Sequence, residues 1–578
     1  MAATPRVADV ETWTAWPNGQ WSLALRVGLS VAESPHMPAQ TQWQLVIGVD
    51  PKVTVHFYPG LEGGLEFTHA HQDYNGEIVT DRRWRSGKPC LEVPFTHLAR
   101  RGWDDEPSDL DERVGWKLHR LFAWIDAAAV GTLRAPGDRF ELPAVKGIVP
   151  PPPLIAFNEA TDDAGRWFAQ PRRLGIAKVA KLPGANKVRY VQSFHSMGDE
   201  PVHAAAWGHA LSESRESEDC LWVLLEQIPV FAPWQLPHTW AQLAELIGHQ
   251  GMDLERALCA FGAYLRRKSL PTKARWLLLG FPVSEKVGDP VIRLHWMAIE
   301  GISLTSRHES RRGFRAIEDN HRAWDRELAR STAELGWRAT ANWATDQLRT
   351  RGQAEQALRE KKVLVIGAGA LGSAVANNLL RLGVLDLGIV DHDTLKAGNL
   401  SRHVLGLVEL GHNKARALAI RLNASAPDAR VVAYPEDLVS PSAIPKTLLD
   451  YDVIVDCTAS DAVLSYLSRV EWGRPKIFVS LSMTWNGAGL LAYSAQGSVF
   501  PAVDALEKFS QAPRPPDEFD QDYPEGIGCW SPVFPVGMDD VQMWGGIATR
   551  FVRAAAASPG DRFSYYVVSP DGTVEKRP

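Results

Sequence analysis

The stretch VLVIGAGALGSAVANNLLRLG, residues 363–383, decides the fold of the C-terminal part of the chain. Its first four residues are apolar and predict a buried strand, and the residues after the glycines predict a helix. Gly367, Gly369 and Gly372 form a GxGxxG motif between them. The first glycine permits a tight turn, the second lets the backbone approach a nucleotide, and the third lets helix and strand pack closely. We predict a nucleotide-binding strand–turn–helix; the motif alone does not distinguish a dinucleotide from ATP, and a turn that binds nothing is the alternative.

Carboxylates follow two of the later predicted strands. LDLGIVDHD (385–393) ends at Asp391 and Asp393, and an acid about twenty residues beyond the glycines suits a ribose hydroxyl. YDVIVDCTAS (451–460) places Asp456 at the end of another buried strand. A carboxylate at the carboxyl end of a strand, near a nucleotide crevice, indicates a Mg²⁺ site.

Three nitrogen-bearing side chains lie between these strands in the sequence. Asn399 and Arg402 occur in GNLSRH, and Lys414 occurs in HNKARA. A dehydrogenase would be expected to continue into a substrate domain with a catalytic histidine or lysine. An amide, a guanidinium and an ammonium group in close succession suit a triphosphate better, because arginine offers a planar fork to phosphate oxygens and lysine offers a point charge.

This ordered series resembles the adenylation domain of ubiquitin-activating-type enzymes, a family that includes the ThiF, MoeB and HesA proteins. The resemblance covers about 361–500. It implies a Rossmann-like domain that uses ATP and Mg²⁺ to convert the C-terminal glycine carboxylate of a ubiquitin-like or sulfur-carrier protein into an acyl-adenylate. By position it also implies roles for single residues: Asp391 would hold the ribose, Asp456 would hold Mg²⁺, and Arg402 would be catalytic. Asn399, Arg402 and Lys414 would hold the phosphates. The implied nucleotide site as a whole is Gly367, Gly369, Gly372, Asp391, Asp393, Asn399, Arg402 and Lys414.

Two positions bear on how closely the family pattern is followed. Ala370 stands where the family often has a further glycine. In the family an arginine from the preceding helix reaches across a dimer, and Arg338 is the candidate here. The chemistry agrees with the residue types, because a carboxylate becomes a good acyl donor once it has displaced pyrophosphate from the α-phosphate. Positioning and charge neutralisation account for most of the catalysis of such a step.

Cys529 is the first candidate to carry the acyl group. It follows the acidic, proline-rich segment QAPRPPDEFDQDYPEG (511–526), which predicts an exposed loop. The motif GCxxPxFP around it resembles the catalytic-cysteine region of the same family. A thiol there could attack an acyl-adenylate and release AMP, leaving a thioester. The alternative is a buried or incidental loop cysteine.

Cys90, in RRWRSGKPCLEVP, is the second candidate. Basic residues upstream would lower the pKa of this thiol if they lie close to it in space. The region around it resembles the ubiquitin-conjugating fold of bacterial conjugating domains, although no His-Pro-Asn tripeptide is present. The alternative is a structural thiol, which is also our interpretation of Cys220, Cys259 and Cys457. The basic residues are Arg82, Arg83, Arg85 and Lys88, and the histidines that could assist are His69, His71 and His97.

The rest of the chain predicts an α/β protein of several domains. TQWQLVIGVD and KVTVHFYP predict N-terminal strands and VGWKLHRLFAWIDAAA predicts a helix, while DCLWVLLEQIPVF and ARWLLLGFPV predict strands further on. The proline run at 150–153 marks a boundary. We expect an α+β ubiquitin-conjugating-like domain (1–153), an α/β linker domain (154–312), a helical connector (313–360), and the adenylation domain (361–578) with a catalytic-cysteine crossover loop at about 505–535.

Composition excludes several other classes. A net charge of −6 argues against a chain that binds nucleic acid through a basic surface. Five cysteines without a CxxC motif form neither a disulfide framework nor a usual zinc ribbon. The N-terminal residues lack the apolar core of a secretory signal, and no stretch resembles a bilayer span, so we expect a cytoplasmic protein.

The order of the domains resembles bacterial fusions of activating and conjugating enzymes found in anti-phage operons with cGAS-like nucleotidyltransferases. The resemblance implies a homodimeric enzyme of antiviral defence. It would activate the C-terminus of a ubiquitin-like or cGAS-like partner, carry it on Cys529 and then Cys90, and ligate it to a lysine of a target protein.

Three alternatives are open. A sulfur-transfer activator of the ThiF or MoeB kind explains 361–500 equally well but leaves the N-terminal residues unused. The glycine motif alone would also suit an NAD- or FAD-dependent oxidoreductase. A nucleotide-sensing scaffold without catalysis is disfavoured by the intact set from Asp391 to Asp456.

Overall fold

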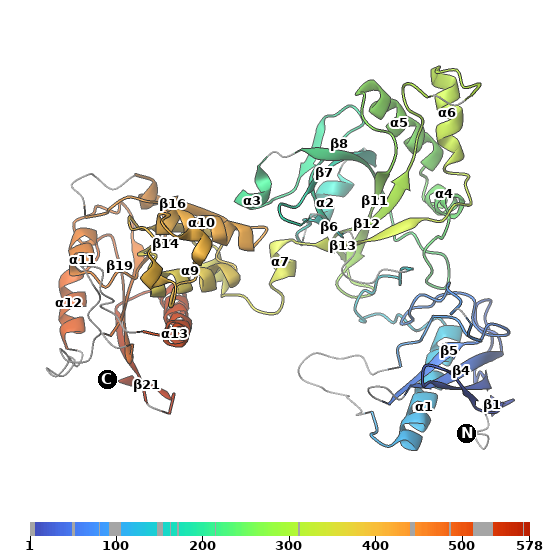
Figure 1. Cartoon of the computed structure of the whole chain (residues 1–578), viewed down its shortest axis with the longest axis horizontal. Helices are drawn as coiled ribbons and strands as arrows, with labels where there is room; N and C mark the ends of the chain where they lie inside the picture. The colour runs from blue at the N-terminus through green and yellow to red at the C-terminus, as the bar shows by residue number, and fades with distance from the viewer. Residues whose placement is uncertain are drawn as a thin grey trace. The chain divides into compact units, whose positions relative to one another are not determined.

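The computed structural model of the 578-residue chain forms two compact units, 1–205 with 216–342, and 206–215 with 343–578 (Figure 1). Figure 1 colours the first mainly blue to green and the second mainly yellow to red. The described residues are 6–48, 53–79, 81–91, 106–146, 154–161, 163–169, 171, 173–185, 187–213, 216–309, 312–439, 446–484, 487–511, 536–569 and 571–577.

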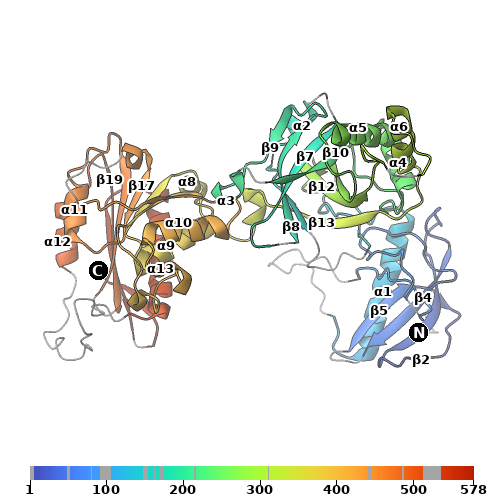
Figure 2. The same ribbon diagram turned by 45° about the horizontal axis from the view of Figure 1, so that its top comes forward.

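The N-terminal part is an antiparallel sheet with one long helix packed on it. The strand order is β1–β3–β4–β5, with β2 beside β3. Alternate residues of β3 such as Leu23, Leu25 and Val27 are buried against α1, which lies along the sheet (Figure 2). The predicted strands and helix are confirmed. The elements are β1 (Val7–Ala8), β2 (Thr14–Ala15), β3 (Trp21–Gly28), β4 (Gln40–Gly48), β5 (Thr54–Pro59) and α1 (Leu110–Ala129).

The middle part is an eight-stranded sheet whose strands close on themselves. The order is β6–β13–β12–β11–β10–β7–β8–β9, and β6 pairs with β8 as well as with β13. Helices α4 and α5 pack on one face, and an aromatic cluster with α2 fills the other. The elements are β6 (Leu154–Phe157), α2 (Ala164–Phe168), β7 (Leu174–Lys181), β8 (Val188–His195), β9 (Pro201–Ala204), β10 (Ser217–Leu224), α4 (Trp240–His249), α5 (Leu254–Arg267), β11 (Arg275–Ser284), β12 (Val291–Ile302), α6 (Glu318–Glu327) and β13 (Gly336–Asn342).

The expectation of a helical connector over 313–360 is wrong in its central part. Helix α6 and the short helices α7 (Thr345–Leu348) and α8 (Gln356–Arg359) are present, but β13 between them is a strand of the middle sheet. It pairs antiparallel with β12 and parallel with β6. The alternating charges of the segment resemble a solvated helix face, whereas pairing with two distant strands decides the conformation of 336–342.

The second unit is a doubly wound sheet with the order β16–β15–β14–β17–β18–β19–β20–β21. Strands β16, β15, β14, β17 and β18 are parallel to one another, and β18 pairs antiparallel with β19. The strand order reverses beside β14, where nucleotides bind in open α/β sheets. The elements are α3 (His209–Ser212), β14 (Val363–Ile366), α9 (Ala370–Arg381), β15 (Asp386–Val390), α10 (Lys414–Ser425), β16 (Arg430–Tyr434), β17 (Val453–Asp456), α11 (Asp461–Leu467), β18 (Lys476–Met483), β19 (Gly489–Gly497), α12 (Ala502–Ser510), α13 (Met538–Ala557), β20 (Arg562–Val568), β21 (Val574–Arg577) and three short 3₁₀ turns, η1 (Ala397–Asn399), η2 (Leu407–Glu409) and η3 (Lys446–Asp450).

Both faces of this sheet are covered. Val363 and Val365 of β14 point to a core that includes α9, α10 and α13, and Leu364 and Ile366 point to a core that includes α11 and α12 (Figure 1). The near-continuous apolar run of β14 follows from burial on both faces. In the described ranges, no helix is long and apolar enough to cross a membrane.

Candidate active site

The glycine turn between β14 and α9 has the tight turn and the close packing predicted for it. Gly367 has a φ of +89°, which side chains disfavour. A Cβ on Gly372 would lie 1.9 Å from the carbonyl oxygen of Gly367, so only glycine fits there. A Cβ on Gly369 would meet nothing within 4 Å, so this face of the turn is open. The turn therefore leaves space in front of the N-terminus of α9, where backbone N–H groups favour phosphate.

Asp391 lies directly beside this turn. It follows β15, and one carboxylate oxygen accepts a hydrogen bond of 2.7 Å from the backbone N–H of Ala368. The other oxygen accepts one of 2.8 Å from the N–H of Asp393. The carboxylate is therefore held at the edge of the glycine turn, as the ribose assignment requires.

Lys414 and Asp393 form an ion pair at the start of α10. The ammonium group lies 2.9 Å from the carboxylate. Burial alone would raise the pKa of Asp393, but the hydrogen bond and charge of Lys414 hold this pKa below its ordinary value. The side-chain amide of Asn413 donates to the carbonyl oxygens of Asp391 and Asp393, which fixes the two segments together. Lys414 is thus a largely buried cation near the glycine turn.

Asn399 and Arg402 lie in the crossover segment that follows. The side-chain oxygen of Asn399 accepts from the backbone N–H of Lys396. The Arg402 guanidinium donates to the backbone carbonyl of Gly398. His403, which sequence reasoning missed, links the segment to the turn, because its Nε2 lies 2.6 Å from the carbonyl of Ala368. Its Nδ1 accepts from Leu405, so Nε2 carries the proton. The only sequence signal for it is its place directly after Arg402.

Asp456 ends β17, next to β14 in the sheet. One oxygen accepts hydrogen bonds from the hydroxyl and backbone N–H of Thr458, and the other accepts from the hydroxyl of Ser480. Burial raises the pKa of this carboxyl above its ordinary value, although these bonds oppose the shift. A cation nearby would favour the charged form.

The arrangement around Asp456 fits Mg²⁺. The methyl group of Thr458 lies 2.9 Å from the position of a Cβ on Gly367, so the segment that follows Asp456 is beside the glycine turn. Mg²⁺ is commonly held by one or two carboxylates together with substrate phosphates. The residues that the structure describes contain no group of three or more His, Cys, Asp and Glu side chains that would hold a metal by themselves.

Arg338 is not where a family arginine on a preceding helix would be. It lies in strand β13, and its guanidinium donates to Glu300 on the neighbouring strand β12 at 2.9 Å. The expectation that Arg338 lies on a helix is wrong, because residues 336–342 form strand β13. Cys529 and His97 lie outside the described residues.

Cys90 is exposed. Its backbone N–H donates to the carbonyl of His71 at 2.7 Å, and Gln72 forms a β-bridge with Pro89. Three of the basic residues upstream have other partners: Arg82 stacks 4.2 Å from the ring centre of Trp16, Arg83 lies 3.9 Å from Glu11, and Lys88 lies 4.0 Å from Asp73. By contrast Cys220 is buried and Cys259 and Cys457 are half-buried, and burial raises the pKa of all three thiols.

The two described candidate histidines differ in environment. His69 is buried, and burial lowers its pKa to about 4. His71 is half-buried, and its hydrogen bond to Glu141 raises its pKa above the ordinary value. Glu141 was not a sequence candidate, because it lies 70 residues further along the chain.

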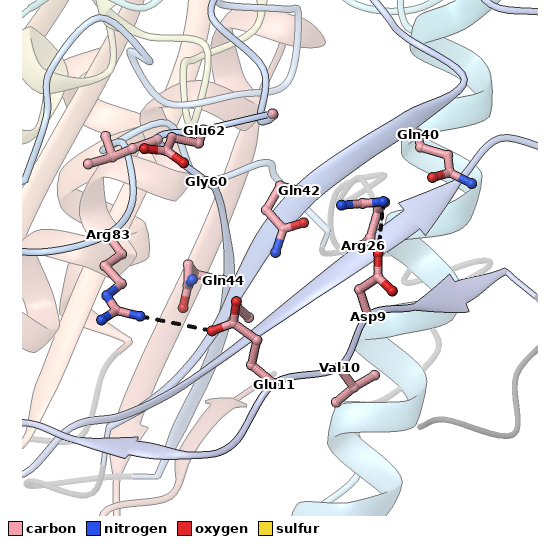
Figure 3. A pocket seen from close by; sticks show the side chains of 13 residues that line it. Asp9, Val10, Glu11, Arg26, Gln40, Gln42, Gln44, Gly60, Glu62 and Arg83 are labelled. Carbon is pink, nitrogen blue, oxygen red and sulfur yellow. Dashed lines mark ion pairs between the residues drawn. The ribbon is translucent and has the colours of Figure 1, made fainter.

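The outer face of the N-terminal sheet carries a polar hollow of about 960 Å³ (Figure 3). Gln40, Gln42 and Gln44 line it from alternate positions of β4, on the side away from α1. Figure 3 shows two ion pairs at its edge, Arg26 with Asp9 at 2.8 Å and Arg83 with Glu11 at 3.9 Å. Of the predicted catalytic residues, Cys90 and Arg402 belong to the described part of the chain, and neither lines this hollow.

Two family models match the chain. The Cap2 central linker domain matches residues 131–343, and the ThiF family matches residues 342–519. The ATP-dependent ubiquitin transferase-like protein Cap2 of Enterobacter hormaechei subsp. hoffmannii (strain UCI 50) is 40% identical over 576 residues, which cover 99% of this chain and 96% of that protein. This chain belongs to the Cap2 family.

Parts of this Cap2-family chain also match more distant proteins. The adenylyltransferase and sulfurtransferase uba4 of Aspergillus niger is 36% identical over 141 residues, 24% of this chain and 29% of that protein. A crystal structure of E. coli MccB with AMPCPP and SeMet MccA covers 38% of this chain and 64% of that chain, at 14% identity and a TM-score of 0.26. The Cap2 linker match begins before the expected boundary at 153 and ends after the expected one at 312.

Proposed function

We propose that the chain activates the C-terminal carboxylate of a partner protein with ATP and transfers it, through two thioesters, to a target amine. The observation that carries this proposal is the site at the switch point of the second sheet. There an open glycine turn, the Asp391 carboxylate bound to that turn and the buried Lys414 ammonium are close to one another. The 40% identity to a protein named as an ATP-dependent ubiquitin transferase-like protein supports it.

In the first step a carboxylate oxygen of the partner attacks the α-phosphorus of ATP, and the bond to pyrophosphate breaks. Gly369 gives the phosphates access to the backbone, and Asp391 accepts from the ribose hydroxyls. Lys414, Arg402 and Asn399 compensate the phosphate charge and orient the leaving group. Mg²⁺, held by Asp456 and the phosphates, supplies further charge neutralisation when bound.

In the second step the thiolate of Cys529 attacks the acyl carbon, and the bond to AMP breaks. The thiolate of Cys90 then attacks the same acyl carbon, and Cys529 leaves as a thiolate. A lysine amine finally attacks the Cys90 thioester, loses a proton and releases the thiol. The exposure of Cys90, in the segment between β5 and α1, supports its role as the last carrier.

In this proposal the residues before the linker match, 1–130, form a ubiquitin-conjugating-like domain, which is shorter than the expected 1–153. An antiparallel meander of β3, β4 and β5, with Cys90 after it and α1 packed on its inner face, supports this assignment. The partner is a ubiquitin-like or cGAS-like protein with an extended C-terminal tail, the enzyme is a cytoplasmic homodimer, and its setting is antiviral defence. A sulfur carrier as the partner is the second candidate, favoured by the match to uba4.

The test is incubation of the chain with ATP, Mg²⁺ and the protein encoded beside it, followed by electrophoresis with and without a reducing thiol. We expect AMP release and a thiol-sensitive adduct. Cys529→Ala should abolish every adduct, Cys90→Ala should keep the first adduct and lose ligation, and Cys259→Ala should change neither. No AMP release in the presence of that companion would contradict the proposal, and an adduct that survives Cys529→Ala would remove Cys529 from it.

A further inference from the structure

The loop that precedes Cys90 is held in place by residues of the Cap2 linker match. The loop, residues 68–76, lies against the Cys90 segment through the bridge between Gln72 and Pro89 and the hydrogen bond from Cys90 N–H to the His71 carbonyl. The backbone position of Cys90 therefore depends on the conformation of His71.

His71 has a conformation that needs support. Its φ of +54° is uncommon for a residue with a side chain. Glu141 provides that support, because one of its carboxylate oxygens lies 2.8 Å from the imidazole Nδ1 and also accepts from the His71 backbone N–H at 3.2 Å. A single carboxylate thus holds both the side chain and the backbone of His71.

A second set of hydrogen bonds holds the two ends of the same loop. The N–H of Thr68 donates to the side-chain carbonyl of Gln235 at 3.0 Å. The Gln235 amide nitrogen then faces Nε2 of His238 at 2.7 Å. With Nε2 as acceptor, Nδ1 of this neutral histidine carries the proton and donates to the Tyr74 hydroxyl at 2.6 Å. The loop is thereby clamped by linker residues at its start, its middle and its end.

We propose that Glu141 and His71 form a clamp by which the linker domain sets the position of Cys90, so that His71 is a positioning residue for acyl transfer. The inference rests on the proposed function for its reaction, but not for its geometry. It gives the linker a role at the Cys90 site in addition to joining two domains.

The charges around His71 define how the clamp depends on pH. The hydrogen bond to Glu141 is the largest influence and, with the charge of Asp138 and a hydrogen bond to the carbonyl of Leu133, it raises the pKa of His71. Arg134, in the same segment, interacts electrostatically with Glu141, while its guanidinium lies 3.4 Å from the ring centre of Trp234. The pKa of His71 is higher in the folded chain than in the unfolded chain. The ion pair with Glu141 is therefore complete at pH values below the ordinary histidine pKa, and it weakens as the pH rises through the raised pKa of His71.

The experiment uses the full chain with Glu141→Gln, which keeps an oxygen able to accept from the His71 N–H but removes the charge. The probe is free lysine, which discharges a preformed Cys90 thioester. We expect kcat to fall about tenfold with KM for lysine unchanged. A misplaced Cys90 thioester reacts more slowly with lysine that is already bound, whereas the binding of lysine itself is not affected. The alkaline limb of the pH profile should also move to lower pH. Glu226→Gln, which breaks the exposed pair with Arg173 in the same domain, is the matched control.

A second measurement makes the test independent of the partner and of folding. The rate of alkylation of Cys90 by iodoacetamide, followed by peptide mass spectrometry, should show a step at the pKa of His71 that shifts to lower pH in Glu141→Gln. Identical alkylation and discharge profiles for wild type and Glu141→Gln would overturn the clamp. If the wild type forms no thioester at Cys90, the proposed function fails, and the alkylation profiles alone decide the clamp.

Discussion

The carboxylate of Asp391 accepts a 2.7 Å hydrogen bond from the backbone N–H of Ala368, inside the glycine turn. The acid after β15 and the turn after β14 are therefore one structural unit, although 23 residues separate them in the chain. Because the same carboxylate also accepts from the N–H of Asp393, its orientation is set before a nucleotide arrives.

Asp391→Asn tests this unit. The asparagine oxygen can still accept from the N–H of Ala368. The substitution removes the negative charge that makes the carboxylate a strong acceptor for ribose hydroxyls. We expect ATP–pyrophosphate exchange to fall by about tenfold or more, since charged hydrogen bonds contribute about 1.5–3 kcal/mol. Glu507→Gln on the exposed side of α12 is the control. Unchanged exchange in Asp391→Asn would mean that Asp391 does not contact the ribose.

The glycines provide a pair of matched substitutions. The methyl group added by Gly369→Ala has no other atom within 4 Å, so we expect this variant to fold normally. We expect its ATP binding to be weaker, because the methyl group occupies the open face of the turn. Gly372→Ala forces a contact of 1.9 Å with the Gly367 carbonyl, so we expect a loss of about 1–3 kcal/mol of stability as well. Thermal unfolding and ATP titration of both variants would separate the two effects. Equal ATP affinity of Gly369→Ala and wild type would place the phosphates elsewhere.

Asp456→Asn should change the dependence on magnesium. The amide cannot neutralise a divalent cation, so the Mg²⁺ concentration needed for half-maximal pyrophosphate exchange should rise by about tenfold or more. Ser480→Ala removes a hydrogen bond to the same carboxylate without removing its charge and should cause a smaller rise. A titration of exchange activity against Mg²⁺ measures both. The assignment of the metal to Asp456 is wrong if the two titrations match that of the wild type.

Glu159 in the middle domain predicts a dependence of stability on pH. It is fully buried, and burial raises its pKa to about 7 although the indole N–H groups of Trp167 and Trp296 donate to it. The folded chain then binds a proton that the unfolded chain releases, so the free energy of unfolding falls as pH rises from about 4.5 to about 7. The total fall is about 3 kcal/mol.

Glu159→Gln should remove this slope. Melting temperatures of wild type and variant, measured between about pH 5 and pH 8, would show curves that converge at low pH and separate at high pH, with the variant more stable there. Glu226→Gln, an exposed residue of the same domain, should leave the slope intact. Parallel curves for wild type and Glu159→Gln would mean that another group titrates.

The local sequence pattern was sufficient to predict those features that depend only on residues close together in the chain. The glycine turn, the two-sided burial of β14 and the carboxylate at the end of β15 follow from spacing over a few residues. Strand β13 was missed because its conformation depends on pairing with β6 and β12, which lie far away in sequence. Glu141 was missed for the same reason, since nothing near it in the chain indicates that it meets His71. His403 could be placed only once its contact with Ala368 was seen.

The closed strand order of the middle domain has a mechanical consequence. Its first strand, β6, and its last, β13, are parallel neighbours, joined from Leu154 with Ala339 to Phe157 with Asn342. A pull that enters before β6 and leaves after β13 loads these hydrogen bonds in shear, all at once instead of one after another. The domain should therefore stay folded under tension between its two flanking parts, and behave as a stiff spacer instead of an unravelling tether.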